Sequence, residues 1–223
     1  MPNYFEMPAK GRPDARQYAP ATERNRDPIL KVLLEVLPPE GTILEISSGT
    51  GEHAIYFAPR LHPRRWIPSD PNPVARESIA TWRQEVSVDN LYSPIALDAS
   101  EAPWSVELPT ALKEFDLENY PIGAIANINM IHIAPWSACL GLMAGAGRIL
   151  PAGGILYLYG PFKQNGQHTA PSNVAFDESL QARNPEWGVR DLEAVVAAAQ
   201  AENLSLKKIY PMPANNLSVI FQA

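Results

Sequence analysis

The clearest candidates for chemistry are two glycines and three acidic side chains that accompany short apolar runs. Gly49 and Gly51 lie in the stretch LEISSGTGEH, where an apolar run leads into a glycine turn and then a helix-like segment. Glycine lets the backbone bend sharply and lets a ligand approach with no Cβ in the way. Glu45, Asp70 and Asp98 stand in or directly after three successive predicted strands. Because open α/β sheets bind ligands beyond the carboxyl ends of their parallel strands, we expect these groups to line one crevice.

Two classes of cofactor fit this pattern. A dinucleotide site would use the loose Gly-x-Gly-x-x-Ala fingerprint, with Asp70 about 20 residues further on to hold a ribose diol. That arrangement leaves Glu45 and Asp98 without a role. An S-adenosylmethionine site uses all the features: the turn passes the methionine part, Asp70 accepts from both ribose hydroxyls, and Asp98 accepts from the adenine amino group. We therefore favour S-adenosylmethionine and keep an NAD(P)-dependent oxidoreductase as the alternative.

Candidate catalytic groups follow the next two predicted strands. His132 comes just after an apolar run, and because an unperturbed imidazole has a pKa of about 6.5, it could act as general base near neutral pH. The alternative is a structural histidine, hydrogen-bonded where the next helix begins. Asn129 precedes it, but the Pro-Pro-Tyr or Pro-Pro-Phe that would orient a planar amine does not follow, which disfavours methylation of nucleic-acid bases. Tyr159 shares a strand face with Tyr157 and is either a core residue or a catalytic one.

Strand-like and helix-like runs alternate at least four times, which predicts βαβ units and a mostly parallel sheet covered on both faces. We expect strands over 42–47, 65–69, 92–97, 122–130 and 155–159, and helices over 27–37, 52–61, 73–86, 103–115, 136–150 and 191–203. Two closing strands, 204–210 and 217–221, are too close for a parallel crossover and must form an antiparallel hairpin. The expected fold is α/β and Rossmann-like, with seven strands. Residues 160–175 are expected to form a long loop of the kind that often serves as a lid.

Composition limits the partners. The chain has 223 residues, 46% of them apolar, and 24 acidic against 18 basic residues give a net charge of -6. This acidity disfavours nucleic acid and anionic membranes, which are held by excess Lys and Arg. Cys139 is the only cysteine, so an internal disulfide is impossible and a reducing, cytoplasmic location is expected. No apolar run reaches about 18 residues, and the histidines and the cysteine lack metal-ligand spacing.

We expect a single domain over residues 1–223, which begins with an irregular arm over residues 1–26. The arm carries Tyr18 and four arginines, which are Arg12, Arg16, Arg24 and Arg26. It is either a solvated tail or a lid that folds over the cofactor pocket and helps to bind an anionic acceptor, with Arg16, Tyr18 and Arg24 facing inward.

Seven segments spread over nearly the whole chain carry a resemblance to a known family. They are YAPATERNRDPI (18–29), LEISSGTGEH (44–53), WIPSD (66–70), NMIHIAPW (129–136), LYLYGPF (156–162), NPEWGVRD (184–191) and MPANN (212–216). In these the chain resembles the uncharacterised predicted methyltransferases that include methyltransferase-like protein 26. The resemblance implies a class I methyltransferase fold and S-adenosylmethionine as donor, and it supplies no acceptor. Ser47 and Ser48 stand where methyltransferases usually have a glycine, so their side chains either narrow the methionine pocket or contact the ligand.

The sequence therefore predicts transfer of a methyl group from S-adenosylmethionine to a small-molecule acceptor. A non-catalytic protein that binds the cofactor and acts through a partner is a further alternative. The expected catalytic residues are His132 and Tyr159, and the expected cofactor-binding residues are Tyr18, Arg24, Glu45, Ser47, Gly49, Gly51, Asp70, Asp98 and Asn129.

Overall fold

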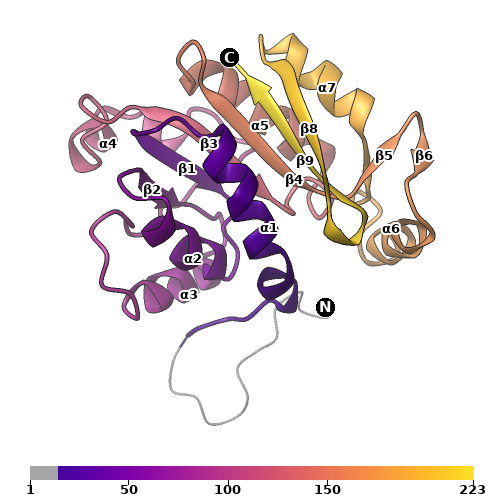
Figure 1. The fold of residues 1–223 in the computed structure, drawn as a ribbon, viewed down its shortest axis with the longest axis horizontal. Coiled ribbons are helices and arrows are strands. Elements are labelled where there is room, and N and C mark those ends of the chain that lie inside the picture. The colour runs from indigo at the N-terminus through magenta and orange to yellow at the C-terminus, as the bar shows by residue number, and fades with distance from the viewer. Residues whose placement is uncertain (1–14) are drawn as a thin grey trace.

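The computed structural model describes residues 15–223, and its centre is a six-stranded sheet. The strands are β1 (Thr42–Ile46), β2 (Arg65–Pro68), β3 (Ile122–Ile128), β4 (Ile155–Gly160), β8 (Ser205–Met212) and β9 (Asn216–Gln222). Their order is β2-β1-β3-β4-β9-β8, with the first four parallel and β9 antiparallel to both of its neighbours. The predicted parallel sheet with an antiparallel C-terminal hairpin is confirmed (Figure 1).

The predicted strand over 92–97 is wrong. This segment runs beside β2 but makes only two isolated parallel bridges, which pair Trp66 with Leu91 and Ser69 with Ile95. Pro68 lies in β2 and residue 94 is also proline, so neither backbone nitrogen can donate. The missing donors interrupt the ladder, and the sheet has six regular strands with this segment along its edge.

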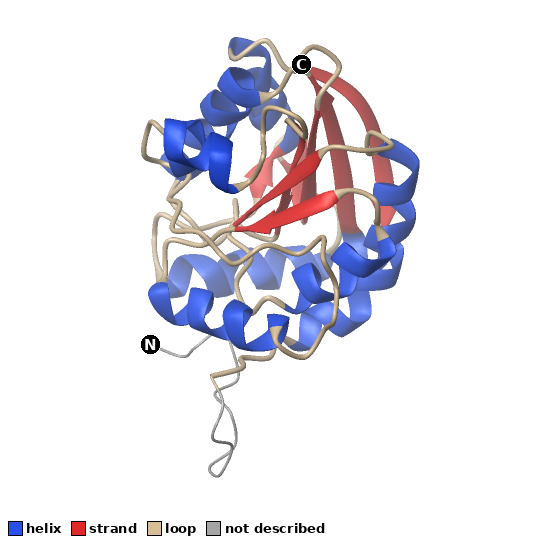
Figure 2. Cartoon of the chain, turned by 90° about the vertical axis from the view of Figure 1, so that its left-hand side faces the viewer, coloured by secondary structure: helices blue, strands red, loops and turns tan. Residues whose placement is uncertain are grey.

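Helices cover both faces of the sheet. They are α1 (Pro20–Val36), α2 (Glu52–Arg60), α3 (Pro73–Arg83), α4 (Pro109–Glu114), α5 (Trp136–Ile149), α6 (Pro171–Arg183) and α7 (Leu192–Ala201), with short 3₁₀ turns at Ser105–Glu107 and Pro213–Asn215. Figure 2 shows these helices flanking the strands. None of the helices within residues 15–223 is long and apolar enough to cross a membrane.

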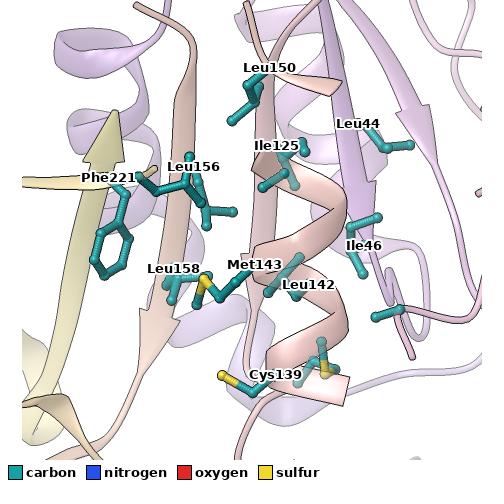
Figure 3. Packing of buried hydrophobic residues seen from close by; sticks show 14 of the residues in the cluster. Leu44, Ile46, Ile125, Cys139, Leu142, Met143, Leu150, Leu156, Leu158 and Phe221 are labelled. Atoms are coloured by element: carbon teal, nitrogen blue, oxygen red, sulfur yellow. The ribbon is translucent and has the colours of Figure 1, made fainter. Parts of the chain in front are cut away.

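Alternating side chains of β4 divide the core into two layers. Leu156 and Leu158 pack on one face against α5, where Leu142, Met143 and Cys139 meet the sheet (Figure 3). On the other face, Tyr157 and Tyr159 belong to the cluster that α1 and α2 complete. Both layers continue to the end of β4, so the carboxyl edge of the sheet is held from both sides.

Helix α1 begins at Pro20, so the prediction of an irregular arm up to residue 26 and a helix start at 27 is wrong. Pro28 lies inside the helix and removes one of its hydrogen bonds, a cost of about 3 kcal/mol. Burial of Thr22 and Asn25 ahead of it, and of Ile29 after it, keeps the earlier turns helical. Of the expected arm, residues 15–19 are described and residues 1–14, which include Arg12, lie outside the described part.

The expected loop over 160–175 is also wrong. Residues 162–191 form a compact unit, called here the 162–191 unit, of three short strands and α6. Strand β5 (Phe162–Gln164) pairs antiparallel with β6 (Gln167–His168) and parallel with β7 (Arg190–Asp191). The unit lies on the opposite side of the molecule from α2 and α3 (Figure 1). Helix α6 buries Asn173, Asp177 and Leu180, and because two of these three are polar, hydrophobic periodicity could not predict it.

Candidate active site at the carboxyl edge of the parallel strands

The turn after β1 has the backbone conformation that the glycine pattern predicts. Ser47, Gly49 and Gly51 all have positive φ, at 57°, 57° and 90°. A Cβ on Gly51 would lie 2.8 Å from the Cα of Ile79 in α3. Glycine is therefore required at position 51 both for its conformation and for this close packing. Ser47 occupies the left-handed region with a side chain, at a cost of about 1–2 kcal/mol.

Asp70 follows β2 and lies directly beside this turn. Its side chain is buried, with the residue 7% exposed, and Oδ2 accepts from the Gly49 N–H at 3.0 Å. Oδ1 accepts from the Asn72 N–H at 2.9 Å. Burial raises the pKa of the Asp70 carboxyl, although both backbone hydrogen bonds oppose the shift. Since each carboxylate oxygen has two lone pairs, each keeps one that can accept a further hydrogen bond.

Glu45 points into the core, beside Trp66. It is 1% exposed, and Oε2 accepts from the Trp66 indole Nε1–H at 3.0 Å. Burial and, to a smaller extent, the nearby Asp70 charge raise the pKa of Glu45 to about 7, although the hydrogen bonds from Trp66 and Ser48 oppose the shift. The observed contacts make Glu45 a link between β1 and β2 under the turn.

Asp98 is half-buried and lies after the edge segment beside β2. Its Oδ1 accepts from the Ser100 N–H at 2.8 Å and from the Ser100 hydroxyl at 2.6 Å. These contacts fix the loop that follows the edge segment.

The ends of β3 and β4 bring Asn129, His132 and Gly160 together. Asn129 has a φ of 61°, and its N–H donates to the Tyr159 carbonyl at 2.9 Å. His132 is 3% exposed, and a Cβ on Gly160 would lie 3.1 Å from its ring atoms Nδ1 and Cε1. Among the described residues, Nδ1 of His132 has no hydrogen-bond partner. Burial, with a smaller contribution from the Arg190 charge, lowers the pKa of His132 to about 3, so the ring is neutral at neutral pH.

Tyr159 belongs to a buried polar group that the sequence analysis did not find. Burial raises the pKa of its hydroxyl, and hydrogen bonds with Asn25 of α1 and Asn216 of β9 oppose the shift. Asn25 Oδ1 lies 2.8 Å from Nε2 of His53 in α2. Burial and the Arg26 charge lower the pKa of His53 to about 3. Asn25, His53 and Asn216 all lie within the segments that carry the family resemblance, which is the one signal in the sequence that includes them.

The described part of the arm packs against the glycine turn and α3. The Gln17 N–H donates to the Ser78 hydroxyl at 2.8 Å, and that hydroxyl donates to the Thr50 carbonyl at 2.7 Å. The Ala19 N–H donates to Oε2 of Glu52 at 2.6 Å. Tyr18 packs edge-on against Trp82 with ring centroids 5.1 Å apart. The arm therefore reaches the outer side of the turn.

The other predicted side chains lie away from the crevice or show no metal-binding arrangement. Arg24 is exposed on α1, so the expectation that it faces inward is wrong. Cys139 is buried in the α5 layer, and burial raises the pKa of its thiol to about 12. Within residues 15–223 no three His, Cys, Asp or Glu side chains are grouped so that they could hold a metal ion.

The sheet order, the antiparallel hairpin and the glycine turn at the carboxyl edge define the class I methyltransferase fold. A crystal structure of human N-acetylserotonin methyltransferase in complex with S-adenosylmethionine matches with a TM-score of 0.68 and 13% identity, covering 91% of this chain and 52% of that chain. For a putative O-methyltransferase from Nostoc punctiforme the TM-score is 0.69 and the identity 15%, covering 89% and 56%. An O-methyltransferase family 2 protein from Planctomyces limnophilus in complex with apigenin gives 0.67 and 19%, covering 89% and 61%.

Residues 16–223 match the family model described as "Protein of unknown function (DUF938)". The chain belongs to this family. It spans 52–61% of the length of the three solved structures named above.

Proposed function

We propose that this chain is an S-adenosylmethionine-dependent methyltransferase that acts on a small-molecule acceptor. The observation that carries the proposal is the contact between Asp70 and the glycine turn, with the Gly49 N–H donating to the Asp70 carboxylate at 3.0 Å. This contact puts the acid that would hold the ribose beside the turn that would pass the methionine part. We also propose that the chain is related to methyltransferase-like protein 26, on the basis of the seven segments that carry the resemblance.

The donor would lie along the carboxyl edge from β2 to β4. Asp70 would accept from the ribose hydroxyls and Asp98 from the adenine amino group through Oδ2, which leaves their present contacts intact. Glu45 would act from below by fixing the turn through Trp66. The remaining contacts are proposed for Ser47, Gly49, Gly51 and Asn129 along the edge and for Tyr18 of the arm.

When bound, S-adenosylmethionine supplies a methyl group on a positively charged sulfur. The main task of the protein is then to hold donor and acceptor in line, about 3–3.5 Å apart, and to exclude water. We place the acceptor above Gly160, where the absence of a Cβ brings His132 against the backbone. With the proton on Nε2, the unpartnered Nδ1 of His132 can accept a hydrogen bond from an acceptor hydroxyl or amine and so orient it toward the donor. Because burial lowers the pKa of His132 to about 3, this orienting role replaces the expected role as general base.

Tyr159 is placed at the other side of the β4 edge. The Asn25 amide has its oxygen engaged by His53, so its NH₂ group faces Tyr159 and can donate to the phenol oxygen. The phenol proton is then available for an acceptor. The net charge of -6 and the apigenin complex of the Planctomyces protein support a small-molecule acceptor over a nucleic acid.

Titration calorimetry with S-adenosylhomocysteine tests the proposal. A charged hydrogen bond contributes about 1.5–3 kcal/mol, so Asp70→Asn should weaken binding at least about tenfold. Asp98→Asn, which loses fewer bonds, is the matched variant and should weaken it less. Preference for NAD or NADP over S-adenosylhomocysteine would refute the proposal in favour of an oxidoreductase. Donor binding without any labelled product, when labelled S-adenosylmethionine is added to a cell extract, would leave a non-catalytic binding protein.

A further inference from the structure

Asp177 is the centre of a buried ionic cluster in the 162–191 unit that the proposed reaction does not use. It lies on α6 and is 4% exposed. Oδ2 accepts from Lys163 Nζ at 2.7 Å and lies 3.1 Å from Nε2 of His168. Oδ1 accepts from the Val189 N–H at 2.7 Å. Burial alone would raise the pKa of Asp177, but the Lys163 and Val189 hydrogen bonds outweigh it and lower the pKa. One carboxylate thus ties β5, β6 and the segment before β7 to α6.

The same two segments that hold Asp177 also hold His132. Phe176, the residue before Asp177, packs edge-on against the His132 ring with centroids 5.6 Å apart. Gly188, the residue before Val189, donates its N–H to the His132 carbonyl at 3.0 Å. Phe176 and Gly188 therefore touch His132. Their immediate neighbours, Asp177 and Val189, belong to the buried ionic cluster.

The fit between these segments is tight. A Cβ on Gly188 would lie 2.9 Å from Asp177 Oδ1, so the backbone at 188 runs directly against the carboxylate. Two residues further along, Arg190 donates from Nε to the Ile131 carbonyl at 2.9 Å and from Nη2 to the Ala134 carbonyl at 2.6 Å. Residues 188–190 therefore hold the backbone on both sides of His132 by hydrogen bonds to its carbonyl groups.

His132 depends on this grip because its Nδ1 atom lacks a partner among the described residues. The ring is fixed by packing against Phe176 on one side and against the backbone of Gly160 on another. Whatever holds α6 and residues 188–189 in place therefore decides where the imidazole lies.

We propose that Asp177 is a positioning residue for His132, acting through Val189, Gly188 and Phe176. This inference rests on the proposed function, in which His132 faces the acceptor. The 162–191 unit is then a support built behind the catalytic histidine, and the Lys163 and His168 contacts serve to keep the Asp177 carboxylate ionised and aimed at Val189.

The test is a nitrogen-15 NMR titration of the histidine rings in the full chain, with the His132 signals assigned by their loss in His132→Asn. A direct electrostatic effect of Asp177 and a positioning effect predict opposite changes in the pKa of His132. Removing a nearby negative charge lowers the pKa of a histidine, whereas loosening its packing admits water and raises the pKa toward about 6.5. Asp177→Ala should raise the pKa of His132 by at least about one pH unit, because burial is what lowers it.

Gly188→Ala is the second variant, since it keeps the Asp177 charge and displaces the backbone. It should raise the pKa of His132 in the same direction. Glu178→Gln is the matched control: Glu178 is the exposed neighbour of Asp177 on α6, so this variant also removes a negative charge from the helix, and the His132 titration should not move. A lowered or unchanged pKa of His132 in Asp177→Ala, or an unchanged one in Gly188→Ala if Asp177→Ala fails to fold, overturns the inference.

Donor binding separates this inference from the proposed function. Asp177→Ala should bind S-adenosylhomocysteine within about threefold of wild type, because Asp177 touches none of the residues proposed to hold the donor. Failure of the wild-type chain to bind the donor would refute the methyltransferase proposal, while the His132 titration would still show whether Asp177 positions the ring.

Discussion

Replacing Glu45 with glutamine should make the protein more stable at alkaline pH and remove part of its pH dependence. The folded chain raises the pKa of Glu45 from 4.5 to about 7, chiefly through burial. Between these values the folded state binds a proton that the unfolded state has lost. The free energy of unfolding therefore falls as pH rises from about 4.5 through about 7. Above the folded pKa, the stability contributed by the protonated Glu45 carboxyl is fully lost.

The magnitude follows from the size of the shift. At about 1.4 kcal/mol for each pKa unit, the shift from 4.5 to about 7 corresponds to about 3 kcal/mol. Glutamine has no charge to desolvate, and its amide oxygen can still accept from Trp66 Nε1 across the observed 3.0 Å. Glu45→Gln should thus match the wild type near pH 4 and exceed it by about 3 kcal/mol near pH 8, or roughly 6–12 °C in melting temperature.

Urea unfolding at several pH values between about 4 and 8 measures this difference directly. Because burial also raises the pKa of Asp70 and of Glu52, the wild-type curve alone is not decisive, and the difference between variant and wild type is the quantity to plot. Glu40→Gln, at an exposed position, is the control and should follow the wild type. A difference between Glu45→Gln and wild type that does not change with pH would refute the reasoning.

Three further outcomes are expected. Gly51→Ala should lower the free energy of unfolding by about 2–5 kcal/mol, because of its positive φ and the overlap of the new Cβ with α3. Gly166→Ala is the control: its φ is also positive, but a Cβ there would meet no atom within 4 Å, so it should cost only about 1–2 kcal/mol. Equal losses in urea unfolding would contradict the packing argument. With its pKa near 3, His132 is neutral through the physiological range, so the methyl-transfer rate should not fall between about pH 8 and 6 on its account. His132→Ala should lower turnover about 10²-fold at every pH, because the acceptor loses the hydrogen bond that orients it. S-adenosylhomocysteine should protect residues 15–19 from proteolysis, and Ser78→Ala, which removes the acceptor of the Gln17 N–H, should reduce that protection. If residues 15–19 are cleaved equally fast with and without the ligand, the arm is not a lid.

The parts of the fold that sequence could predict are those with strong apolar periodicity. Strand β1, the glycine turn and α2 follow from one continuous stretch, and the position of Asp70 beside Gly49 follows from the parallel pairing of β1 with β2. Helix α6 could not be found this way because Asn173 and Asp177 are two of its three buried residues. Their burial is compensated by long-range partners, such as Val189 for Asp177, that no local window contains.

The buried polar group around Tyr159 was out of reach for a similar reason. Asn25, His53 and Asn216 come from α1, α2 and β9, and only the assembled sheet brings them to the end of β4. A lone asparagine or histidine in a helix is equally consistent with an exposed position. The resemblance marked the segments in which these residues lie without saying which of their side chains would meet.

Backbone strain at the carboxyl edge connects the fold to the proposed chemistry. Ser47 and Asn129 directly follow β1 and β3, and both have positive φ without being glycine. Such strain persists only where the surroundings impose it. Next to Ser47, the Ser48 N–H donates to the Ser69 carbonyl at 2.8 Å, and the Asn129 N–H donates to the Tyr159 carbonyl at 2.9 Å. Each strained residue is thus held by a bond to the neighbouring strand or its end. Because these bonds lie within the protein, the sheet itself sets the backbone of the crevice before any ligand arrives, and donor binding need not meet the entropy cost of ordering it.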